Sequence, residues 1–237
     1  MADNVVAVLF SYLDRVSQQD LLSLDAENIE GLPRLGSLLP ETAVREFQRM
    51  LTDSGSTSHF LQRVAWLMCW LMERNKIRPW LLYRFGASFL QANHASLLEV
   101  VASILKPPGC RMTIKVRHRG GAYYACMING CTSPVCVGNV VMCLVFWHGQ
   151  SFAAAYVGRV AHQRQLADAL HYALNGETVE LLEGLHTDLG AAFRMGCRNL
   201  INSVTYRRAA RLTVGEEYFV PQQQHSNVPG RHPGGFL

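Results

Sequence analysis

The stretch RMTIKVRHRGGAYYACMI, at residues 111–128, decides the fold that the sequence predicts. Apolar and polar residues alternate along its first half, its second half is a short apolar run, and Arg119-Gly120-Gly121 lies between them. Alternation at period two indicates β-strands, and a glycine pair between two strand-like runs indicates a tight turn. A short apolar run beside a turn is also consistent with a strand. We therefore expect a hairpin with strands at Met112–His118 and Ala122–Ile128.

A second hairpin is predicted directly after the first. A loop at Asn129–Gly138 precedes strands expected at Asn139–Trp147 and Ser151–Val157, and four consecutive strands with short turns make an antiparallel meander. Further along, apolar spacing predicts three more elements: a helix at Val160–Leu174, a strand at Thr178–Leu182 and a helix from Thr187 to Val204.

The residues before this sheet show helical periodicity. Asp20–Leu39 has room only for short helical turns, and Pro107-Pro108-Gly109 ends the helical part. The expected helices are Val5–Val16, Pro40–Thr52, His59–Asn75, Pro79–Phe85 and Gln91–Leu105.

The fold class expected is therefore α+β, with an all-helical domain followed by an antiparallel sheet backed by helices. The helical domain is predicted at residues 1–90 and the sheet module at 91–204. Residues 205–237 show no apolar periodicity and are expected to form a disordered tail.

Composition points to a folded intracellular protein. The chain has 237 residues, of which 49% are hydrophobic, and this is ample for a packed core. No apolar run approaches the roughly 20 residues that cross a bilayer. Asp3 and Asn4 stand where a secretory signal would carry basic residues. The seven cysteines are an odd number and lie mostly in or beside apolar runs, which is typical of buried thiols.

Charge is distributed unevenly along the chain. Residues 1–60 contain four Lys and Arg against nine Asp and Glu, whereas residues 61–125 contain ten against two. Lys115, Arg117 and Arg119 alternate and so share one face of the first strand of the meander. Such a row can bind nucleic-acid phosphates, or it can be an ordinary solvated face. The predicted nucleic-acid-binding residues are Lys76, Arg78, Arg84, Lys106, Arg111, Lys115, Arg117 and Arg119.

No catalytic motif accompanies these cations. Glu73 and Glu99 are isolated in the basic region, so there is no carboxylate pair for acid–base chemistry, and no glycine-rich loop precedes a helix as phosphate binding requires. We expect no catalytic residue, cofactor or metal. A small metal-dependent enzyme remains a minor alternative, although the spacings of its candidate ligands lack a paired C-x-x-C; these are Cys126, Cys131, Cys136 and Cys143.

Several segments resemble centromere protein N, a family of inner-kinetochore subunits. The similarity extends over about residues 5–204. It is carried by the order of the elements, by a helix at Leu189 and by short matches: LVFW at 144–147, FA at 152–153, QLADAL at 165–170 and TVELL at 178–182.

This resemblance implies a pyrin-like, or death-fold-like, helical domain and a non-enzymatic nuclear protein of the centromere. Family members bind the centromeric nucleosome and its DNA through a basic groove, and they pair with centromere protein L. Asp3 matches an acidic residue that contacts the histone in the family, whereas Phe10, Ser11, Gly184 and His186 stand where the family has basic residues.

The expected function is therefore a kinetochore subunit that binds the centromeric nucleosome or DNA together with other inner-kinetochore subunits. No small-molecule substrate and no membrane is expected. The alternative is a scaffold that binds only proteins, through death-fold-like helices, and has no affinity for DNA.

Overall fold

A six-stranded antiparallel sheet forms the centre of the protein. The computed structural model describes residues 3–27, 32–53, 55–131 and 140–216. Met1–Gly196 forms one compact unit, and the chain from Cys197 onward forms a second. The strand order in the first unit is β2-β3-β4-β5-β1-β6, with each neighbouring pair antiparallel. The predicted α+β fold class is confirmed.

The predicted meander is confirmed as well. Its four strands pair in sequence order and are β2 (Cys110–Arg119), β3 (Ala122–Cys131), β4 (Val140–Trp147) and β5 (Phe152–Val157). Most of the loop expected between β3 and β4 falls in residues 132–139, outside the described part of the chain.

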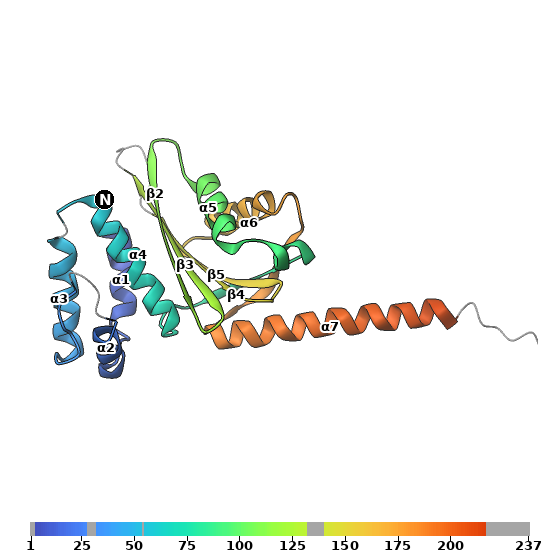
Figure 1. The fold of residues 1–237 in the computed structure, drawn as a ribbon, viewed down its shortest axis with the longest axis horizontal. Helices are drawn as coiled ribbons and strands as arrows, with labels where there is room; N and C mark the ends of the chain where they lie inside the picture. Colours follow the sequence, from blue (N-terminus) through green and yellow to red (C-terminus); the bar gives the residue numbers. More distant parts are fainter. Residues whose placement is uncertain (1–2, 28–31, 54, 132–139, 217–237) are drawn as a thin grey trace, which may run out of the picture. The chain divides into compact units, whose positions relative to one another are not determined.

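Helices cover both faces of the sheet (Figure 1). On one side lie α1 (Asp3–Leu13), α2 (Gln18–Asp25), α3 (Pro40–Thr52) and α4 (Thr57–Glu73), and α4 packs directly on β2 and β3. On the other side, α5 (His94–Leu105) and α6 (Val160–Ala173) pack on apolar side chains such as Tyr83, Met127 and Phe146. The sheet therefore has a core on each face.

One predicted helix is wrong. Pro79–Phe85, expected to be helical, forms the strand β1 (Trp80–Phe85), which pairs with β5 and with β6 (Val179–His186). Five of its six residues are buried, as is typical of a central strand, and its aromatic residues favour this conformation. Pro79 precedes the strand, where its missing N–H interrupts no ladder. The first half of the chain is therefore not all helical.

The remaining elements differ from the prediction only at their ends. α3 has the predicted bounds, and a short 3₁₀ helix at Ala87–Gln91 precedes α5. α7 (Leu189–Glu216) continues past Val204 into the segment expected to be disordered, and residues 217–237 lie outside the described residues. No helix in the described part of the chain has the length and apolar character needed to span a bilayer.

A histidine takes part in the aromatic core beneath α5. The ring of His94 stacks on Phe89 at 5.0 Å and on Phe146 at 5.5 Å between centroids. Burial, assisted by the nearby His148, lowers the pKa of His94 below its ordinary value of 6.5. The unfolded chain therefore binds a proton at His94 more readily than the native state does. The contribution of neutral His94 to the free energy of unfolding is fully present above pH 6.5 and is lost as the pH falls through the lowered pKa.

We expect His94→Phe to weaken this loss of stability in acid. Phenylalanine can keep the stacked arrangement and has no site to protonate, so the free energy of unfolding should decrease less between about pH 7 and pH 5. Urea unfolding across this range measures the slope. Burial also lowers the pKa values of His162 and His186, so these two residues still make the stability of the variant depend on pH. An unchanged slope would show that His94 contributes nothing to it.

Candidate nucleic-acid interface

The row of cations on β2 lies on the face of the sheet that carries α4. Lys115, Arg117 and Arg119 share this face because strand side chains alternate. The Cys69 thiol of α4 points its single S–H group at two carbonyl oxygens, that of Lys115 at 3.3 Å and that of Tyr124 at 3.5 Å. The row therefore borders an internal contact between helix and sheet.

Arg117 is held by two carboxylates and an aromatic ring. Its guanidinium donates two hydrogen bonds to Glu73, one of them from Nη2 to Oε2 at 3.2 Å, and Nη2 lies 2.8 Å from Glu27 Oε2. The guanidinium also lies over the Trp66 ring, 4.8 Å from its centroid. The Glu73 side chain is only 2% exposed, so this arrangement neutralises a carboxylate that water barely reaches.

Arg119 completes the same network. Its Nη1 atom lies 3.3 Å from Glu73 Oε2 and 3.5 Å from Glu27 Oε1. Two of the three cations in the row therefore bind carboxylates of the protein itself, which come from the end of α4 and from the turn after α2.

Two further predicted residues form ion pairs. Lys76 Nζ lies 2.8 Å from Asp20 Oδ2, and Arg84 pairs with Glu180 across β1 and β6. Burial alone would raise the pKa of Asp20, but hydrogen bonds from Lys76 and Ser17 outweigh burial and lower it below 3.8. Asp20 therefore stays ionised and holds Lys76 against α2.

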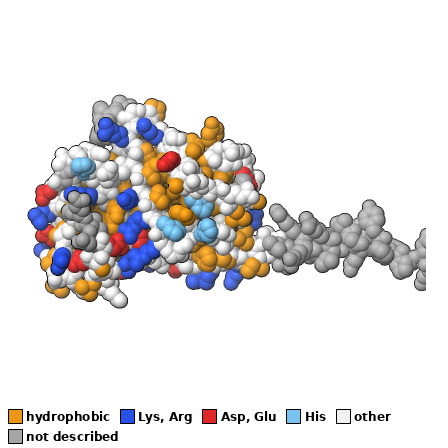
Figure 2. Space-filling model, in the orientation of Figure 1, with side chains coloured by type: hydrophobic (Ala, Val, Ile, Leu, Met, Phe, Trp, Pro, Cys, Tyr) orange, Lys and Arg blue, Asp and Glu red, His pale blue; other side chains and the backbone are white. Residues whose placement is uncertain are grey.

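The other four predicted residues are exposed, and none forms an ion pair with a residue that the structure describes: Arg78, Lys106, Arg111 and Lys115. Arg111 and Lys115 share one face of the edge strand β2, whereas Arg78 precedes β1 and Lys106 follows α5. On the face shown in Figure 2, Lys and Arg side chains over the N-terminal helices lie interspersed with Asp and Glu. The eight residues do not form one continuous group.

The carboxylates that organise this region, Glu73 and Glu27, were not predicted from the sequence to take part in it. Glu73 ends an α4 helix in which nine other residues are buried, and a lone acid in that position indicates an internal charge partner. The sequence around Glu27 gives no such indication, because its partner Arg119 lies 92 residues further along the chain.

Two of the four candidate thiols, those of Cys126 and Cys143, are core residues. Cys126 and Cys143 lie opposite each other on β3 and β4 and are fully buried, and burial strongly raises the pKa of the Cys126 thiol. Protonated thiols are poor nucleophiles and poor metal ligands. Among the described residues, no three His, Cys, Asp or Glu side chains converge as at a metal site. Cys136 and the side chains of Cys131 and Asp3 lie outside what the structure describes.

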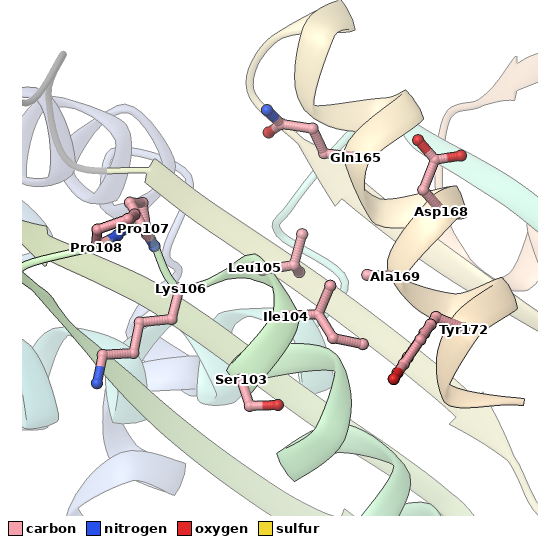
Figure 3. A pocket seen from close by; sticks show the side chains of 10 residues that line it. All are labelled: Ser103, Ile104, Leu105, Lys106, Pro107, Pro108, Gln165, Asp168, Ala169 and Tyr172. Atoms are coloured by element: carbon pink, nitrogen blue, oxygen red, sulfur yellow. The ribbon is translucent and has the colours of Figure 1, made fainter.

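A groove of about 830 Å³ runs between α5 and α6 on the opposite side of the sheet (Figure 3). Leu105 and Ala169 lie at its centre, and the exposed side chains of Ile104 and Tyr172 border it. This groove was not predicted from the sequence, because it depends on how two helices meet.

No model of a known protein family matches this chain, and no curated protein matches it.

Replacing Arg117 tests the internal network. We expect Arg117→Ala to lower the free energy of unfolding by about 3 kcal/mol, because the buried Glu73 carboxylate loses its two-pronged partner. Lys115→Ala, on the same strand and face, should change it by less than about 0.5 kcal/mol. Urea denaturation of both variants measures the difference. Equal effects would mean that the pairing with Glu73 adds nothing to stability.

Proposed function

We propose that this protein is a non-catalytic adaptor that binds other proteins, and that it acts at the inner kinetochore as the resemblance to centromere protein N predicts. The observation that supports a protein-only adaptor is the internal use of Arg117 and Arg119, whose guanidinium groups neutralise Glu73 and Glu27. A phosphate would have to compete with these carboxylates, and displacing them would leave Glu73 buried without its partners.

A second candidate function is weak binding to the DNA of the centromeric nucleosome. It is favoured by Arg111 and Lys115, which are exposed on one face of β2 and form no ion pair with any described residue. Binding through so few cations is weak and has a shallow dependence on salt, with a slope of about −0.9 for each phosphate neutralised. Such contacts add affinity without sequence preference.

DNA binding separates the two functions. Fluorescence anisotropy of a labelled duplex, titrated with the protein at about 50 mM salt, should show no saturable binding for a protein-only adaptor. Affinity that falls with salt and is lost in Arg111→Glu with Lys115→Glu would instead support the DNA-binding function. Arg45→Glu with Arg164→Glu is the control with the same change of charge at exposed positions elsewhere.

The kinetochore assignment has its own test. We expect the tagged full-length chain, expressed in dividing cells, to collect at the sites where chromosomes attach to the spindle. Fluorescence microscopy through mitosis records this distribution. A signal that stays diffuse from prophase to anaphase would refute the assignment and would leave the biochemical proposal to be judged by protein binding alone.

A further inference from the structure

The groove between α5 and α6 combines an apolar centre with two free charges of opposite sign. Ile104 is 41% exposed and Tyr172 is 72% exposed, which is unusual for large apolar side chains on one contiguous surface. Lys106 and Asp168 line the same groove, are exposed and form no ion pair with a described residue. Figure 3 shows Lys106 on the α5 side and Asp168 on the α6 side.

We propose that this groove is the contact surface of a symmetric homodimer, in which Lys106 of each copy faces the partner's Asp168. A two-fold contact brings the same patch of both subunits together, so the patch must be complementary to itself. One cation and one anion on opposite sides of an apolar centre meet this condition. A two-fold axis that crosses the groove midway between them forms both charge pairs at once.

The size of the surface sets the expected strength of the dimer. The 12 residues of α5 and the 14 of α6 correspond to helices about 18 and 21 Å long. A face made of two such helices lies near the lower limit of specific interfaces, for which dissociation constants in the micromolar range are common. The dimer should therefore form and dissociate with concentration.

A second copy satisfies the groove better than an unrelated apolar segment does. An apolar partner would cover Ile104 and Tyr172 but would leave Lys106 and Asp168 without counter-charges at the edge of the contact. A second copy supplies both counter-charges and the apolar surface from residues already present. Charge complementarity thus selects the orientation, and apolar burial supplies the attraction.

Charge reversal tests the proposal. Sedimentation velocity over a concentration series should show a monomer–dimer equilibrium for the full chain. Lys106→Glu and Asp168→Lys should each weaken dimerisation by about tenfold or more, because each replaces two attractive pairs by two repulsive ones. In the variant with both substitutions, the dissociation constant of the dimer should return to within about threefold of the wild-type value, since the charge pairs form again with exchanged sign.

Arg45→Glu and Glu99→Lys are the matched controls. They make the same changes of charge on α3 and α5 at exposed positions that do not line the groove, and they should leave the dimer unaffected. A wild-type chain that stays monomeric at about 100 μM overturns the proposal, as does a double variant that fails to recover. The assay contains no DNA and no kinetochore protein, so its result is independent of the proposed function.

Discussion

The buried carboxylate of Glu73 is the constraint on which the packing of the N-terminal helices against the edge of the sheet depends. An ionised group that is 2% exposed costs several kcal/mol of desolvation unless it is paired, and its partners, Arg117 and Arg119, come from the edge strand of the sheet. α4 can bury its end only where β2 presents these two residues. Since a shift of one position would turn both to the opposite face, the network also fixes the register of β2 beneath the helices.

The same network explains the uneven charge of the sequence. The acidic residues of the first 60 positions include Asp20 and Glu27, and these pair with Lys76, Arg117 and Arg119 from the basic middle of the chain. Opposite charges that are separated along the sequence meet in the fold. A basic segment is therefore weak evidence for an external anion when an acidic segment of the same chain packs against it.

Local sequence patterns predicted the four strands of the meander. The strand β1 and the ion pairs of Arg117 depend on long-range contacts that such patterns do not show. Alternation indicated β2, whose two faces differ, and the short turns between the strands marked the ends of the apolar runs that form β3, β4 and β5. β1 was missed because a short run that is buried on both faces has no alternation, and Trp80–Phe85 fits a helix as well as a strand. The pairing of Arg117 with Glu27 was beyond prediction, since nothing in the sequence indicates that the turn after α2 reaches the edge of the sheet.

The Glu73 network and the groove between α5 and α6 lie on opposite faces of the sheet and differ in how their charges are satisfied. On the side of α4, the Glu73 network and the Asp20–Lys76 pair neutralise charge within the chain. On the side of α5 and α6, Lys106 and Asp168 flank exposed apolar side chains and lack partners among the described residues. Apolar surface supplies attraction and unpaired charge supplies selectivity. The proposed contact at the groove between α5 and α6 therefore breaks no ion pair that the structure describes.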